Sequence, residues 1–60
     1  MEKFKALEDR LMANNTKLTQ LLKGIREGTV SHEAACLELA ANAEEREAVY
    51  KDIKAAVTEE

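Results

Sequence analysis

The two side chains best suited to metal or thiol chemistry, His32 and Cys36, lie four residues apart in a stretch with the composition of a helix. Residues at this spacing share one face of a helix, so the pair could hold a metal ion only together with further ligands. The sequence contains no second His or Cys, whereas a closed zinc site usually needs four such ligands. We therefore expect no metal site. We interpret His32 as a first-turn residue of a helix and Cys36 as a small core side chain.

The sequence carries no pattern of a catalytic site. No nucleophile is spaced with a general base, and no glycine-rich phosphate loop is present among its two glycines. Carboxylates are plentiful, but they fall on the solvated face of the second half of the chain. We expect a protein that is not an enzyme, with no catalytic residues and no cofactor.

The elements that must position any working surface are helices. Proline is absent, and Ala, Leu, Glu and Lys, which favour helices, are abundant. Gly28 is suited to ending one helix and Ser31 to capping the next. The sequence predicts an all-α fold with a single helical-hairpin domain over residues 1–60. Its helices should span about 2–27 and 32–58, and the turn at 28–31 is short enough to make them antiparallel.

Apolar residues recur at alternating steps of three and four along both predicted helices, which is the pattern of a coiled-coil seam. The seam consists of Phe4, Leu7, Leu11, Leu18, Leu21, Ile25, Leu39, Val49, Tyr50, Ile53 and Val57. One hairpin would leave one side of this seam in water, and so short a chain seldom forms a sufficient core alone. We expect two hairpins to pair as a homodimeric four-helix bundle. A heterodimer with another helical protein would satisfy the same physics.

A polar layer interrupts the seam at Asn14, Asn42 and Arg46. With the turn centred near residue 30, Asn14 faces Arg46 and Leu18 faces Asn42, so the interruptions of the two helices coincide. This coincidence favours the register. We interpret Asn14 as a residue that sets register and oligomeric state, and Arg46 as one that extends its charged end into water. The alternative is that the layer binds a ligand.

The charges are unevenly divided between the halves of the chain. Residues 1–28 hold six bases and four acids, whereas residues 31–60 hold three bases and eight acids. The halves should therefore attract each other. Lys3, Arg10 and Lys17 are one heptad apart, and the simplest interpretation is that they flank the seam.

In a dimer this basic stripe would be doubled and could follow a phosphate backbone. In hairpin layout and in its more basic first helix, the chain resembles the Rop family of plasmid regulators, which dimerise and bind paired RNA loops. That resemblance implies nucleic-acid binding, with Lys3, Arg10 and Lys17 as phosphate contacts. The only aromatic residues, Phe4 and Tyr50, are expected to be buried, which argues against base stacking.

A small apolar patch is expected on the outer side of the second helix, formed by Ala34, Leu37 and Ala41. Small residues there could let a partner helix approach closely, although they also serve as surface residues with high helix propensity. The leading hypothesis is a small regulatory protein-interaction module of the adaptor, inhibitor or co-chaperone type, acting as a helical dimer. Small regulators of phages and plasmids share this size and layout. Nucleic-acid binding is the alternative.

The expected location is the cytoplasm. No apolar run is long enough to span a membrane, and the charged start lacks a secretory signal. A single free thiol also suits a reducing compartment. The expected partners are a second copy of the chain and another protein, with no membrane involved.

Overall fold

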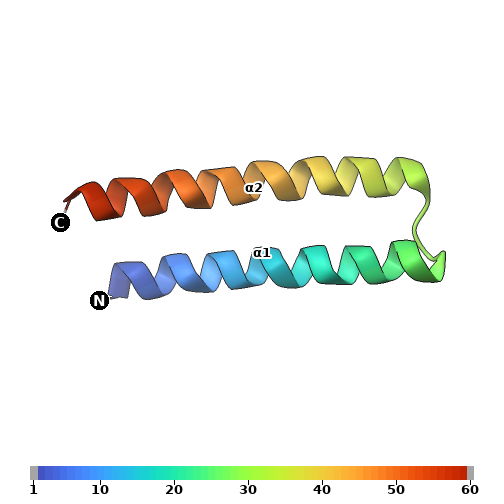
Figure 1. The fold of residues 1–60 in the computed structure, drawn as a ribbon, viewed down its shortest axis with the longest axis horizontal. Coiled ribbons are helices and arrows are strands. Elements are labelled where there is room, and N and C mark those ends of the chain that lie inside the picture. The colour runs from blue at the N-terminus through green and yellow to red at the C-terminus, as the bar shows by residue number, and fades with distance from the viewer. Residues whose placement is uncertain (1, 60) are drawn as a thin grey trace.

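Two long helices form an antiparallel hairpin (Figure 1). The computed structural model describes residues 2–59, in which α1 spans Glu2–Glu27 and α2 spans His32–Glu59. These bounds lie within one residue of the predicted ones, and the predicted all-α hairpin is confirmed. The hairpin is a thin rod with extents of 45 × 16 × 10 Å. No helix within 2–59 combines the length and apolar character needed to cross a membrane.

The stretch around Asn15 and Thr16 is a poor helix former, yet α1 continues through it without a break. The Thr16 hydroxyl donates to the Met12 carbonyl at 3.0 Å, and the Thr19 hydroxyl donates to the Asn15 carbonyl at 2.9 Å. Both threonine hydroxyls therefore hydrogen-bond to backbone carbonyls four residues earlier in α1, and neither caps a new helix.

The turn is built from the residues that the sequence suggests. Gly28 adopts a φ of +75°, a left-handed conformation that favours glycine. Its N–H donates to the Ile25 carbonyl at 3.2 Å, while the Thr29 N–H donates to the Gly24 carbonyl at 2.9 Å. This pair of bonds is a Schellman motif, which satisfies the last carbonyls of α1. On the other side of the turn, Ser31 Oγ accepts from the backbone N–H of the third residue of α2 at 3.2 Å.

Gly24 is needed for a different reason, namely close packing. A Cβ atom added to it would lie 2.6 Å from Val30 Cγ2. Gly24→Ala should destabilise the hairpin by about 1 kcal/mol, because this clash outweighs the gain in helix propensity. Val30→Ala in the Gly24→Ala background should restore the loss, as measured by urea unfolding.

Gly28→Ala is the matched control. Nothing lies within 4 Å of a Cβ added there, so its cost of about 1 kcal/mol should come from the backbone alone. Val30→Ala should not rescue it. If one Val30 change rescued both glycine variants, the steric explanation for Gly24 would be wrong.

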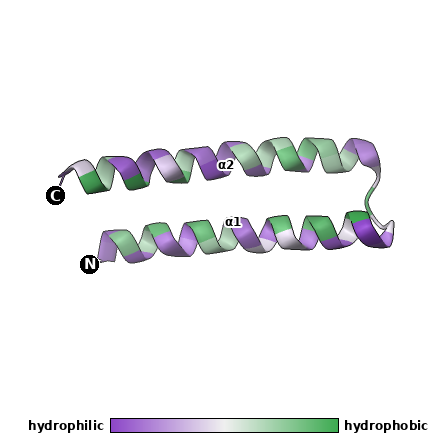
Figure 2. Ribbon diagram, in the orientation of Figure 1, coloured by the Kyte–Doolittle hydropathy of each residue, from purple (hydrophilic) through white to green (hydrophobic). Residues whose placement is uncertain are grey.

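The buried core is a narrow line between the two helices. On α1 it contains Leu7, Asn14 and Leu21, and on α2 it contains Ala35, Val49 and Ala56. These residues are spaced by seven or a multiple of seven, and the remaining buried residue of α1 is Gly24, which packs against the turn. Figure 2 shows hydrophobic and hydrophilic bands alternating along both helices, as amphipathic helices require.

Several predicted seam residues lie outside this line in the single hairpin. Tyr50 and Val57 are 54% and 58% exposed, and Leu39 is 39% exposed. The expectation that Tyr50 is buried is therefore wrong for the single chain. Cys36, expected in the core, is also exposed. Two helices in contact cover only the stripe that faces the partner helix, which is narrower than the apolar arc of either helix.

Candidate interaction surfaces

One side of the hairpin is lined by ion pairs. Lys3 Nζ lies 3.6 Å from a Glu59 carboxylate oxygen, and the Arg10 guanidinium lies 2.8 Å from Asp52. Further along, the Lys17 ammonium is 3.3 Å from Glu45. The three bases are the predicted phosphate contacts, and each has an acid of α2 opposite it at the same seven-residue repeat. The structure thus places them as flanking charges of the seam.

Asn14 is the centre of the polar layer and is fully buried, with 0% of its surface exposed. Its Nδ2 donates to the Asn42 carbonyl at 3.0 Å and to Glu45 Oε1 at 3.1 Å. In return, Asn42 Nδ2 donates to the Asn14 carbonyl at 3.1 Å. Arg46 Nε donates to Asn14 Oδ1 at 2.8 Å. The three predicted members of the layer therefore meet around one amide.

Arg46 does not simply extend into water, as the sequence suggested. Its Nε holds Asn14, and its terminal nitrogen donates to Asn15 Oδ1. Sequence reasoning missed Asn15 and Glu45 as members of this network. Both sit directly beside a predicted member, and Glu45 occupies an ordinary charged position, so only the register of the helices reveals their role. Within residues 2–59, every buried side-chain nitrogen and oxygen has a hydrogen-bond partner.

The electrostatics of Glu45 follow from this network. The hydrogen bond from Asn14, together with the hydrogen bond and charge of Lys17, holds the pKa of the Glu45 carboxyl below its ordinary value. The folded state therefore binds this proton more weakly than the unfolded chain does. The resulting stabilisation is present above the ordinary glutamate pKa of about 4.3 and is lost as the pH falls through the lower folded value.

Glu45→Gln should lower the Tm at pH 7, because the amide removes the charge that attracts Lys17. At pH 3 the difference in Tm between the variant and the wild type should be smaller than at pH 7, because the stabilisation from the Glu45 charge falls as the pH drops below the ordinary glutamate pKa. Thermal unfolding followed by circular dichroism at the two pH values measures this difference. An equal difference at both values would show that the charge of Glu45 plays no part.

The opposite side of the hairpin is apolar and uncovered. On α1 each base that pairs with an acid of α2 lies four residues before a buried residue. Positions 4, 11 and 18 lie three residues before a buried residue, and this spacing places them, together with position 25, on the other side of the helix. On α2 the same reasoning places positions 39, 46 and 53 on this second side of the hairpin. Positions 36, 43, 50 and 57 lie on the same side but farther from α1. We call this side the open face. Its larger apolar residues are Phe4, Leu11, Leu18, Leu22, Ile25, Leu39, Tyr50, Ile53 and Val57.

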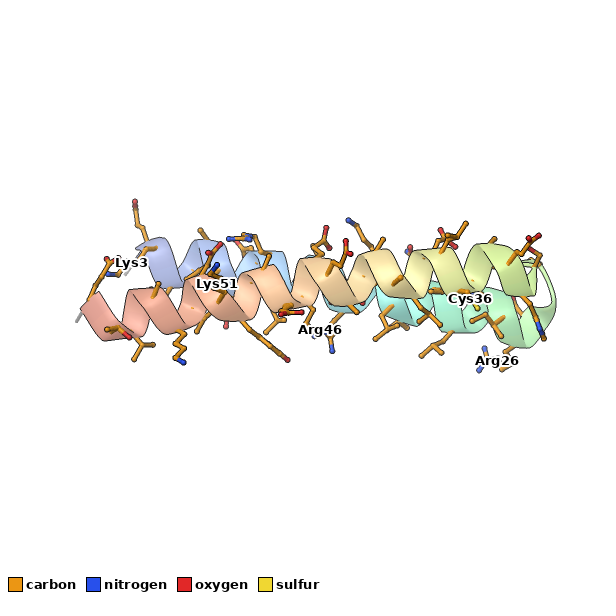
Figure 3. The ribbon with its side chains drawn as sticks, turned by 90° about the horizontal axis from the view of Figure 1, so that it is seen from above. Lys3, Arg26, Cys36, Arg46 and Lys51 are labelled. Carbon is orange, nitrogen blue, oxygen red and sulfur yellow. The ribbon has the colours of Figure 1, made fainter. Side chains whose placement is uncertain are left out.

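Exposure on the open face is substantial. Leu22 is 55% exposed and Ile25 is 36% exposed, similar to the values for Tyr50 and Leu39. Arg46 interrupts this face at its middle. Figure 3 shows the Arg46 side chain near the middle of the rod, directed toward the lower edge of the view.

No protein-family model, curated protein or solved structure matches this chain. What its surfaces can do is therefore inferred from their own side chains.

The predicted outer patch on α2 is present in part. Leu37 is 74% exposed, the highest value among the large apolar residues, and Ala41 is exposed beside it, whereas Ala34 is half-buried. Ala41 also lines a shallow groove of about 370 Å³ near the turn, between α1 and α2. Lys17, the last of the three bases, also lines this groove.

His32 and Cys36 lie at the exposed start of α2. Within residues 2–59, no group of three or more His, Cys, Asp or Glu side chains is arranged to hold a metal ion. Both side chains line one hollow together with Glu33 and Leu37.

Proposed function

We propose that this chain is a non-enzymatic protein-interaction module that works as a homodimer. Two hairpins pair through their open faces into a four-helix bundle, and the outer patch of Ala34, Leu37 and Ala41 binds a second protein. The mechanism is occupancy of a partner surface, as expected for an adaptor, inhibitor or co-chaperone. The cytoplasm is the proposed location, which suits the lone thiol.

The observation that carries the dimer is the exposure of the open face. Five large apolar residues on one side of a two-helix rod are between 36% and 58% exposed. An exposed apolar surface that is not scattered over single residues usually marks an interaction site, and here it lies on both sides of Arg46. The single hairpin also buries very few apolar side chains, so a second chain would supply the core that it lacks.

The outer patch lies on another side of α2 than the open face and adjoins it only at Cys36, which lines one hollow with Leu37. Leu37→Asp should leave the dimer intact, because Leu37 points away from the open face and is 74% exposed. The same variant should lose the protein that the wild-type chain retains in affinity purification from its host. Retention of the same partner by Leu37→Asp would refute the outer patch as its binding site.

The dimer itself is tested by light scattering coupled to size exclusion, over a range of concentrations. A particle of twice the 6.7 kDa chain mass supports it. A folded particle with the mass of one chain at low micromolar concentration would refute it.

Nucleic-acid binding is the weaker alternative. The three bases proposed as phosphate contacts lie beside carboxylates at 2.8 to 3.6 Å, so a phosphate would have to compete with those acids. A gel shift at low salt, where phosphate contacts are strongest, tests it. A shift that disappears as salt is raised would support this alternative against the protein-binding proposal.

A further inference from the structure

We infer that the protein bound by the outer patch also inserts a basic side chain, a lysine or an arginine, into the groove between α1 and α2, where it pairs with Glu38. This inference rests on the proposed function, because it assumes a protein partner, and it adds the chemistry of that partner. It follows from an acid of α2 that has no base opposite it and from the groove beside that acid.

The first observation is that α2 carries one more acid on the ion-paired side than α1 carries bases. Acids recur there every seven residues, at Glu38, Glu45, Asp52 and Glu59. The last three lie 2.8 to 3.6 Å from the bases of α1. The same spacing places Gly24 opposite Glu38, so α1 offers no charged side chain to it. Among residues 2–59, Glu38 takes part in no ion pair.

The second observation is that Glu38 lines a groove. The groove has a volume of about 370 Å³ and lies next to the turn. Leu21, Val30 and Ala41 give it apolar surface, and Gln20 and Asn42 add side-chain amides. A lysine or an arginine has a long apolar stem and a cationic end, so it suits a groove that offers both kinds of surface.

The charges of the groove favour a cation. Its charged residues are Lys17, Glu38 and Glu45. The Lys17 ammonium lies 3.3 Å from Glu45, so these two charges offset each other. The carboxylate of Glu38 is the charge that remains. It would repel a phosphate or an acidic side chain, whereas it would form a charge-assisted hydrogen bond with an ammonium or a guanidinium.

The groove is continuous with the outer patch. Ala41 belongs to the patch and also lines the groove. It lies three residues after Glu38 and four after Leu37, and residues at these spacings are neighbours on a helix surface. One partner can therefore cover the exposed Leu37 with an apolar side chain and reach Glu38 with a basic one. The ion pair would fix how that partner is oriented on the patch.

A peptide selected on the protein itself provides a defined probe. A phage-displayed library of random dodecapeptides is selected on the immobilised wild-type chain, and the most enriched peptide is synthesised with a fluorescent label. Its dissociation constant is measured by fluorescence anisotropy for the wild type, Glu38→Gln and Glu47→Gln. Glu38→Gln should weaken binding about tenfold, because the amide cannot form the ion pair.

Glu47→Gln is the matched control. It removes the same charge from an exposed position of α2 outside the groove, so binding should stay within about twofold of the wild type. Both carboxylates are exposed, so circular dichroism should show the same helix content in the two variants. Replacing the basic residues of the peptide one at a time by norleucine should yield one peptide that binds the wild type and Glu38→Gln alike.

The neutral change Leu37→Ser separates this inference from the proposed function. A peptide that is lost on Leu37→Ser but binds Glu38→Gln as tightly as the wild type would overturn the groove site and leave the outer patch standing. Equal losses in Glu38→Gln and Glu47→Gln would also overturn the groove site, because only the net charge would then matter. Peptides indifferent to both Leu37→Ser and Glu38→Gln, or no enriched peptide at all, would count against the outer patch as well.

Discussion

Asn14→Asp should lower the free energy of unfolding by roughly 3 kcal/mol at pH 7, although the two side chains have almost the same shape. Asn14 is fully buried, and its Nδ2 donates to the Asn42 carbonyl and to Glu45 Oε1. An aspartate carboxylate cannot donate, so it would set oxygen against oxygen at both contacts, and one of these is a charged carboxylate. The attraction to Arg46 offsets only part of this cost.

The matched control for this prediction is Asn15→Asp. Asn15 is the next residue, is exposed, and also accepts from Arg46. A carboxylate there keeps the acceptor and adds an opposite charge, so stability should stay the same or rise slightly. Urea unfolding of the two variants and the wild type measures the difference. Equal losses in both variants would mean that the network around Asn14 does not depend on its donated hydrogen bonds.

The pH dependence gives a second signature. The buried carboxyl that Asn14→Asp introduces beside Glu45 should have a raised folded pKa, because desolvation and the like charge disfavour ionisation. Its penalty is then largest above that folded pKa and shrinks as the pH falls through it. The gap in stability between Asn14→Asp and Asn15→Asp should therefore narrow between pH 7 and pH 4.

The ends of the helices could be predicted from local chemistry alone. Gly28 and Ser31 carry their roles in their own backbone and side chain, so no knowledge of the rest of the fold is needed. The meeting of Asn14 with Arg46 could also be predicted, because a short turn ties the register of the two helices together. A non-local contact was thus available from a local feature.

Which of the apolar residues of each helix face the other helix could not be predicted. The heptad pattern marks both Leu39 and Val49 as apolar positions, yet Val49 is 1% exposed while Leu39 is 39% exposed. Two features favour burial of Val49 over Leu39. Ion pairs such as Arg10 with Asp52 lie along one side of the hairpin, and the small residues Ala35 and Ala56 allow the helices to approach closely. These are pairwise effects that appear only once both helices are placed.

The ion pairs also change how the basic stripe is understood. Each of its bases, read along α1 alone, is a plausible phosphate contact. In the hairpin, however, each base has an acid of α2 opposite it, so most of the positive charge of the stripe is neutralised by α2. Exposed pairs of this kind contribute at most about 1 kcal/mol each. They select the side on which the helices meet more than they stabilise the fold.

Leu39→Ala and Leu37→Ala test the proposed dimer through stability. The two leucines lie two residues apart on α2, with Leu39 on the open face and Leu37 on the outer side. In a solitary hairpin Leu37 is 74% exposed, so Leu37→Ala should be nearly silent, whereas Leu39 is 39% exposed, so Leu39→Ala should cost only about 1 kcal/mol. In a four-helix bundle Leu39 is enclosed by the second copy, so its truncation should cost on the order of 2 to 5 kcal/mol. Leu37→Ala should stay within about 0.5 kcal/mol of the wild type.

Concentration dependence makes this comparison decisive. The Tm of a dimer rises with protein concentration, because association stabilises only the folded state. The wild type and Leu37→Ala should both show this rise, with almost the same midpoint at every concentration. Leu39→Ala should unfold at a lower temperature throughout, and its population should shift toward monomer at low micromolar concentration. If the wild type and both leucine variants unfolded independently of concentration, the open face would not be a dimer interface.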